Sequence, residues 1–303
     1  MNTASSPRLS VTVTVFTSFD QEHPSHPAVA QLDQGPGGVD SFGTALWVLT
    51  RKANEPGAYQ TPPSSLRVLP ASLVGATESL SDTAARILRD EIGVDVTYRL
   101  RQSRIFDDVD PGAEDRVISV NYWTFVHIDA LAPLLGGKEQ VGLQLVSSSH
   151  SLENWSVMTK LEDFDGVSRF GLRFAPDHPN ALRKQLTVEL WGSPTLDGSD
   201  DQKVFYAWRE LRRAFSGRYD PFRVIGSQAL GKNFRLSDLR SLYEVIRGQK
   251  IQSDQFRRMT TGEHGFIEAA GSLDTSGSRP GKPATMFRLK DWAIPKSGHQ
   301  PTQ

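Results

Sequence analysis

The chain has no cysteine among its 303 residues. This absence excludes disulfide bonds, thiol nucleophiles and cysteine-ligated zinc sites. The sequence also lacks any run of about 18 apolar residues, so it predicts no membrane-spanning helix. Its first ten residues show no basic stretch followed by an apolar run, so we expect no secretory signal and a cytoplasmic protein.

The composition is typical of a globular protein, with 38% hydrophobic and 23% charged residues. The net charge is −1, but the charges are unevenly distributed. Residues 217–303 hold 14 Lys and Arg against 8 Asp and Glu, a net +6, whereas residues 1–216 hold 20 against 27, a net −7. Opposite charges suggest two functions, because a basic module can neutralise nucleic-acid phosphates. Chance sorting of surface charge is the alternative.

The first two-thirds of the chain contains a series of strand-like segments rich in β-branched and aromatic residues. They lie at residues 11–16, 45–51, 66–74, 94–100, 116–127, 142–146 and 186–191. Helices are predicted over 81–92, 130–135 and 203–215, the last with an apolar stripe at helical spacing. Residues 137–200 otherwise give weak signals. A mixed strand and helix domain is therefore expected.

Two helices are predicted near the C-terminus. The first begins at Ser237 as N-cap and buries one face at i, i+3, i+4 and i+7. The second covers Ser253–Thr261, with Phe256 and Met259 facing the core, and Gly262 ends it. Strands at 265–268 and 285–289 flank a basic hairpin tip at 272–283.

The order helix, turn, helix, strand, basic loop, strand is that of a winged helix, whose second helix lies in the major groove of DNA. The outward side chains of that helix and the wing tip are the candidate DNA contacts. They are Ser253, Gln255, Arg257, Arg258, Thr261, Arg279 and Lys282. A winged helix used for protein contacts is the alternative.

Residues 72–94 resemble a Nudix box, the loop, helix and turn that place carboxylates around magnesium and a diphosphate. The positions in register with the family pattern are Glu78, Arg86, Leu88, Glu91, Gly93 and Val94. Three positions depart from it: Ser72 replaces a glycine, Ile87 a glutamate and Asp90 another glutamate. An ordinary amphipathic helix that buries Ile87 is the alternative.

Magnesium-assisted hydrolysis needs hard oxygen ligands that converge on the phosphates. The set at Ile87, Asp90 and Glu91 has lost one carboxylate and shortened another. The sequence therefore predicts no metal site, no catalytic residue and no enzymatic activity.

Two further segments resemble Nudix-related transcriptional regulators of NAD metabolism. In these regulators an acidic loop after the box leads into a strand close to RVISVxY, and residues 105–122 carry Asp108, Asp115, Arg116–Val120 and Tyr122 in this pattern. Residues 230–256 resemble the winged helix of the same regulators. The altered box and the long insertions are most similar to the alphaproteobacterial subgroup.

The resemblance implies an α+β fold: a Nudix-like mixed-sheet α/β/α sandwich over residues 8–216, a winged helix-turn-helix over 218–292 and a disordered tail over 293–303. In that family the Nudix domain binds ADP-ribose or a related nucleotide, and the bound state changes DNA affinity. The implied ligand-binding residues are Arg51, Arg86, Phe106, Asp108, Arg116, Ser119 and Tyr122. Arginine forks suit phosphate oxygens, although Arg86 can instead pair with Glu78 or Glu91.

The resemblance further implies a homodimeric repressor of NAD biosynthesis or salvage genes that binds a palindromic operator in double-stranded DNA. It requires no cofactor, and its effector is expected to be ADP-ribose, NAD or ATP. An active Nudix pyrophosphohydrolase with a fused winged helix is the main alternative, and Ile87 is the residue that discriminates against it. A scaffold protein without DNA affinity is a third possibility.

Overall fold

The computed structural model describes residues 7–20, 44–52, 67–94, 100–108, 116–135, 141–150, 157–163, 166–174, 186–192, 196, 199–215, 229–247, 250–262, 265–274 and 284–293. Among these residues no helix is long and apolar enough to cross a membrane.

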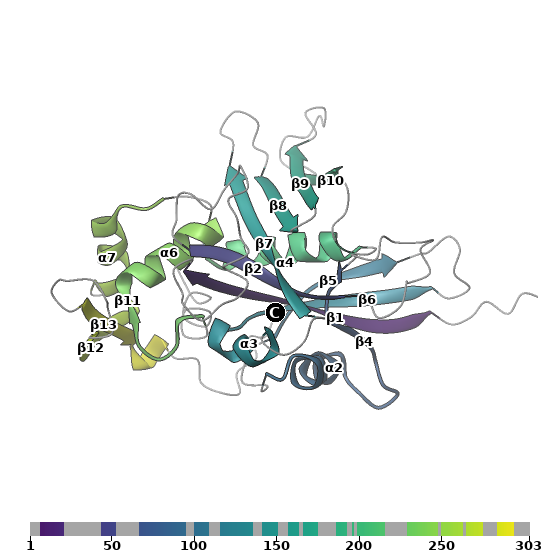
Figure 1. Ribbon diagram of the computed structural model, residues 1–303, viewed down its shortest axis with the longest axis horizontal. Helices are drawn as coiled ribbons and strands as arrows, with labels where there is room; N and C mark the ends of the chain where they lie inside the picture. The colour runs from purple at the N-terminus through teal and green to yellow at the C-terminus, as the bar shows by residue number, and fades with distance from the viewer. Residues whose placement is uncertain are drawn as a thin grey trace, which may run out of the picture.

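A ten-stranded sheet forms the centre of the molecule (Figure 1). Its strands are β1 (Arg8–Asp20), β2 (Thr44–Lys52), β3 (Arg67–Val68), β4 (Ala71–Leu73), β5 (Arg101–Asp108), β6 (Val117–Phe125), β7 (Val141–His150), β8 (Val157–Asp163), β9 (Gly166–Phe174) and β10 (Leu186–Gly192). The order is β10-β9-β8-β7-β2-β1-β6-β5, with β3 beside β2 and β4 beside β1. Because β1 pairs with β6 in parallel and with β2 antiparallel, the sheet is mixed, as predicted.

Helices cover both faces of this sheet. One face packs against α2 (Leu80–Arg86), its π-helical continuation η1 (Ile87–Glu91) and α3 (Ile128–Leu135), and the other packs against α4 (Asp200–Ala214). Alternation along β1 turns Val11, Val13 and Val15 toward the first core and Phe16 toward the second. This confirms the α/β/α sandwich.

The C-terminal module has the winged-helix arrangement predicted from the sequence. It consists of β11 (Phe234–Arg235), α6 (Leu236–Arg247), α7 (Ser253–Thr261), β12 (Ile267–Asp274) and β13 (Ala284–Leu289), with the strands in the order β11-β13-β12, followed by the short turn η2 (Asp291–Ala293).

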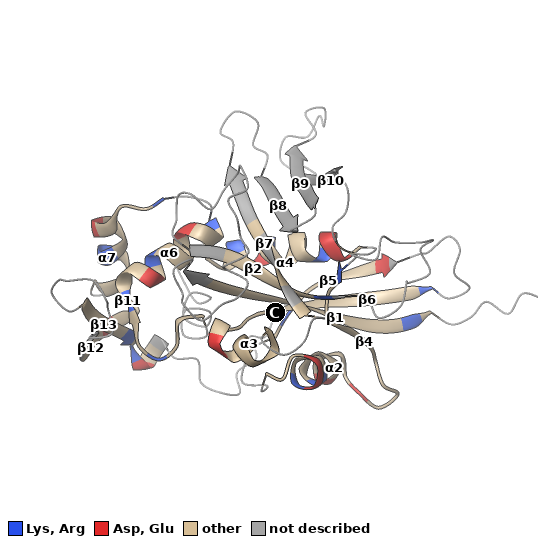
Figure 2. Ribbon diagram, in the orientation of Figure 1, with Lys and Arg blue, Asp and Glu red and all other residues tan. Residues whose placement is uncertain are grey.

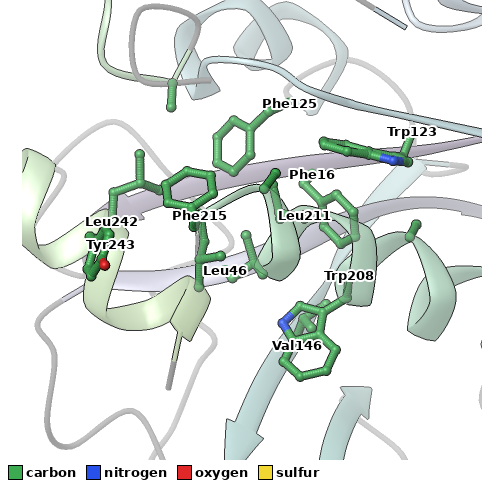
Figure 3. Packing of buried hydrophobic residues seen from close by; sticks show 14 of the residues in the cluster. Phe16, Leu46, Trp123, Phe125, Val146, Trp208, Leu211, Phe215, Leu242 and Tyr243 are labelled. Carbon is green, nitrogen blue, oxygen red and sulfur yellow. The ribbon is translucent and has the colours of Figure 1, made fainter. Parts of the chain in front are cut away.

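One hydrophobic core joins the sheet, α4 and the winged helix (Figure 3). Trp208 and Leu211 of α4 lie over the sheet, and the next turn places Phe215 against Tyr243 of α6, with ring centres 6.3 Å apart. Tyr243 also contacts Phe256 of α7 edge-on at 5.6 Å. The winged helix is therefore packed directly on the sheet domain through α4 and α6.

Three local predictions were wrong. Ser237 is the second residue of α6 and not its N-cap; Asp238 instead accepts a hydrogen bond from the Arg235 backbone N–H at 3.4 Å. Met259 is 45% exposed, whereas Thr260 is buried, because Thr260 lies four residues after the buried Phe256 on the same helical face.

The third error concerns the segment after the box. Part of the expected acidic loop is strand β5, which begins at Arg101 and ends at Asp108. Most of the strand predicted over 94–100 falls outside the described residues. Strands β8 and β9 were not predicted from the sequence.

Candidate functional site

The box segment is organised around an ion pair between Glu78 and Arg86. The Arg86 guanidinium donates to both Glu78 carboxylate oxygens, at 2.7 and 2.9 Å, and the backbone N–H of Gly75 donates to the same carboxylate at 3.1 Å. The Arg86 hydrogen bonds and the Gly75 N–H lower the pKa of Glu78 to about 2. The carboxylate is thus committed to holding the loop before α2.

Arg86 also anchors the strand that leads into the box. It donates to the Ser72 hydroxyl and to the Leu73 carbonyl, both at 3.1 Å. Together with Glu78, these acceptors engage every nitrogen of the guanidinium. The structure therefore contains the Arg86–Glu78 pair that the sequence left open, and Arg86 has a structural role here.

The three carboxylate positions of the box helix, at residues 87, 90 and 91, do not form a magnesium site. Ile87 is 1% exposed and packs in the core on the α2 face. Asp90 is exposed to solvent, and the Glu91 carboxylate lies 3.5 Å from the Arg51 guanidinium. Burial is the main cause that raises the pKa of Glu91. The described residues contain no group of three potential metal ligands, so the residues at this position do not fit magnesium.

A different cluster lies on the opposite face of the sheet, between β5 and α4. Phe106, 8% exposed, contacts Tyr206 with ring centres 5.9 Å apart and a tilt of 56°. The Arg104 guanidinium lies 4.0 Å from the centre of the Tyr206 ring, and Lys203 Nζ lies 5.7 Å from that of Phe106. The sequence identified Phe106 but not its partners, because strand and helix are about a hundred residues apart in the chain.

Buried polar groups position α4 over the sheet at this cluster. Lys203 pairs with Asp200 at 3.0 Å, and Asp200 accepts the backbone N–H of Leu69 at 2.8 Å. The Asn121 amide donates to the Lys203 carbonyl at 3.1 Å. Because each of these buried groups has a partner, the first turn of α4 is held at a defined place on the sheet.

The other predicted ligand residues are spread over the sheet. Ser119 is buried and shares a hydrogen bond of 2.9 Å with Thr12. Tyr122 is buried in the core on the α2 face, away from Phe106, and Arg116 pairs with Asp107. Asp108 ends β5, and its side chain is outside the described residues. The structure therefore does not bring the seven predicted residues into one site.

Helix α7 presents a polar face to solvent. Three of its polar side chains are exposed: Gln255, Arg257 and Arg258. Figure 2 colours the basic and acidic residues of α6 and α7. Thr261 turns back to the helix and donates to the Arg257 carbonyl at 2.8 Å, and Ser253 accepts a hydrogen bond from Arg240. The predicted wing-tip residues, Arg279 and Lys282, lie outside the described residues.

A buried carboxylate on α6 organises the turn before α7. Glu244 is 5% exposed in its side chain and accepts the backbone N–H of Ile251 at 3.0 Å. Arg240 and Lys250 lie 3.7 and 3.8 Å from its two oxygens, and Arg240 also donates to Ser253 at the start of α7. Glu244 thus connects α6, the turn and the first residue of α7.

Replacing Glu244 with alanine is expected to lower the free energy of unfolding by about 1–3 kcal/mol, because the partly buried Ile251 N–H loses its acceptor. DNA affinity should fall as well, since the start of α7 loses its alignment. Urea titration and a gel shift measure the two effects. Glu244→Gln keeps an acceptor and is the control; equal losses in both variants would contradict the positioning role.

Residues 226–289 match the family model of the NrtR DNA-binding winged helix domain. The match covers the described C-terminal module and agrees with its winged-helix fold. A comparison with curated protein sequences finds no match.

Solved structures share the whole architecture. A MutT/nudix family protein from Enterococcus faecalis is 17% identical, with 96% of this chain and 89% of that chain covered and a TM-score of 0.57. NrtR from Shewanella oneidensis is similar both in complex with a 27mer DNA (19% identity, 93% of each chain, TM-score 0.56) and alone (18%, 93% and 94%, 0.56). These likenesses show the fold: a Nudix-like sheet domain followed by a winged helix.

Proposed function

We propose that this protein is a ligand-responsive transcriptional regulator that binds double-stranded DNA through α7. The observation that carries the proposal is the exposed Arg257 and Arg258 pair on the second helix of a module that matches a DNA-binding winged helix family. Arginine is the side chain best suited to guanine edges and phosphates in the major groove. The similar Shewanella NrtR structure in complex with DNA supports the same use of the fold.

The Nudix-like domain is proposed to sense an adenine nucleotide, such as ADP-ribose, NAD or ATP, without hydrolysing it. The support is chemical: Ile87 occupies a ligand position of the box with an alkyl side chain, and Glu78 is committed to Arg86. Binding without turnover suits a sensor, because the ligand then shifts a two-state equilibrium between arrangements that differ in DNA affinity.

The finer parts of the proposal rest on the family resemblance. They are a cytoplasmic homodimeric repressor of NAD biosynthesis or salvage genes, of the alphaproteobacterial kind, on a palindromic operator. A two-fold dimer would present two copies of α7 about 34–36 Å apart, one turn of DNA. Selection of bound sequences from random duplexes should therefore return a palindrome with that half-site spacing.

The reader-helix assignment is tested with the selected duplex at fixed salt. Arg257→Ala combined with Arg258→Ala should weaken specific binding by on the order of 100-fold, since each good base contact contributes about 1–3 kcal/mol. The matched control removes two other arginines: Arg89, exposed on η1, and Arg288, which pairs with Glu268. If both double variants bind equally well, α7 is not the reader.

An assay for AMP and ribose 5-phosphate, the two products of hydrolysing the diphosphate bond of ADP-ribose, separates this proposal from the pyrophosphohydrolase alternative. With magnesium and ADP-ribose we expect no turnover above background, because the metal ligands do not converge. Magnesium-dependent turnover that Glu91→Gln abolishes would establish the enzyme instead.

A further inference from the structure

The three arginines that the sequence assigns to phosphate binding all have carboxylate partners. Arg51 lies 3.5 Å from Glu91, Arg86 holds Glu78, and Arg116 donates to both oxygens of Asp107. A phosphate at any of these positions would have to compete with a carboxylate already in place. The box region is therefore a poor place for a nucleotide phosphate in this chain.

Arg104 and Arg209 are differently placed. Arg104 is exposed on β5 above the Tyr206 ring, and Arg209 follows Tyr206 by one turn of α4. With the residues that the structure describes, neither guanidinium forms a hydrogen bond or an ion pair. Glu210, the nearby carboxylate, lies 3.7 Å from Arg213. Cations thus gather around Tyr206 without matching anions.

The charges are close enough to affect each other. Partial burial, then the charges of Arg104 and Arg213, lower the pKa of Arg209, and Glu210 opposes this only weakly. Like charges held together without a counter-charge destabilise the folded protein, and an anion that binds between them removes the repulsion. An anion bound between Arg104 and Arg209 would therefore be favoured at this place.

Aromatic surface adjoins these cations. Tyr206 is half-buried and tilts against the buried Phe106, so the two rings form a wall beneath the Arg104 guanidinium. A guanidinium fork accepts two phosphate oxygens, and the Tyr206 ring can accept the flat face of a base once Arg104 has turned from the ring to a phosphate. Lys203 is paired with Asp200, and its Nζ atom lies over the Phe106 ring.

We infer that Arg104, Arg209 and the Tyr206–Phe106 wall bind the phosphate and ring of a nucleotide, on the α4 face of the sheet and not at the box. The inference rests on the proposed sensor function and names the place of its ligand. It also provides a route to the DNA-binding module, because the same helix α4 leads to Phe215, which packs on Tyr243 of α6. A ligand that draws β5 and α4 together acts on the helix that supports the winged helix.

The test measures binding of ADP-ribose, ADP and inorganic diphosphate to the full chain by calorimetry. Arg104→Gln combined with Arg209→Gln should weaken ADP-ribose and diphosphate binding by on the order of 100-fold, because two charge-assisted contacts are lost. Tyr206→Leu should weaken ADP-ribose by about tenfold but leave diphosphate unchanged, and Tyr206→Phe should restore ADP-ribose binding. The matched control is the Arg89→Ala, Arg288→Ala protein, expected to bind all three probes as the wild type does.

Three results would overturn this assignment. One is an unchanged affinity for ADP-ribose in the Arg104→Gln, Arg209→Gln protein. Another is that Arg51→Ala abolishes ADP-ribose binding while this double variant binds as tightly as the wild type, which would place the ligand at the box. The third is absence of binding of all three probes to the wild-type chain. The regulator proposal is tested separately, by a gel shift without nucleotide. A protein that binds ADP-ribose but not DNA would contradict the regulator proposal without contradicting the nucleotide site.

Discussion

Replacing Ile87 with glutamate, which restores the carboxylate of the Nudix box, is expected to destabilise the protein and not to create a hydrolase. Ile87 is 1% exposed and lies in a fully apolar cluster on the α2 face. A carboxylate in such a place holds its proton, and the raised pKa alone corresponds to about 3–4 kcal/mol of lost stability at neutral pH. Urea titration measures the change in the free energy of unfolding.

The pH dependence of this variant provides an internal check. A buried glutamate has a pKa above its unfolded value, so the folded state binds the proton more tightly and the loss of stability grows as pH rises above that unfolded value. Ile87→Val is the matched control and should cost about 0.5–1.5 kcal/mol at every pH. A stable Ile87→Glu protein that hydrolyses ADP-ribose to AMP and ribose 5-phosphate with magnesium would show that the box needs only this one carboxylate.

Replacing Tyr243 with alanine is expected to have a comparable effect on stability and a larger one on regulation. Its ring lies between Phe215 and Phe256, and so connects α4 with α7. Removing a buried aromatic side chain costs about 3–5 kcal/mol, because both neighbours lose their contacts. In the fraction of the Tyr243→Ala protein that stays folded, ADP-ribose should change DNA affinity less than in the wild type. The measurement is the ratio of the dissociation constants for DNA with and without the nucleotide.

Tyr243→Phe separates packing from hydrogen bonding. The ring stays in place, and the hydrogen bond from Arg247 to the tyrosine hydroxyl is lost, which should cost about 0.5–1.5 kcal/mol. The nucleotide effect on DNA binding should then match that of the wild type. If Tyr243→Ala keeps the full nucleotide effect at a temperature where it is folded, coupling does not pass through this aromatic contact.

Local patterns predicted the C-terminal module well. Helix α7 occupies the predicted residues, Ser253–Thr261, because a helix with one apolar stripe and a Gly stop is specified by neighbours in the chain. The same reasoning failed at Met259, where exposure depends on the exact rotation of the helix against α6. Side-chain spacing determines a face only to within about one residue.

The candidate site was predicted less well. Arg51, Arg86 and Arg116 were chosen for their chemistry, but each has a carboxylate neighbour that the sequence does not reveal or leaves as one choice among several. The sequence did not identify Tyr206 and Arg104, because their contact joins a strand and a helix that are distant in the chain. A bulge in β5 between Gln102 and Ile105, where the register against β6 shifts, precedes Phe106 and is invisible in the sequence.

The sequence alone determined the modular order, the lost carboxylate at Ile87 and the exposed arginines of α7, because periodicity, spacing and residue chemistry are local properties. Only the tertiary structure decided which charges are neutralised and, among the residues that it describes, which face of the sheet carries arginines without an ion pair. It also decided that one core joins α4 to the winged helix. These features depend on contacts between distant segments, whose energies arise only when the chain has folded.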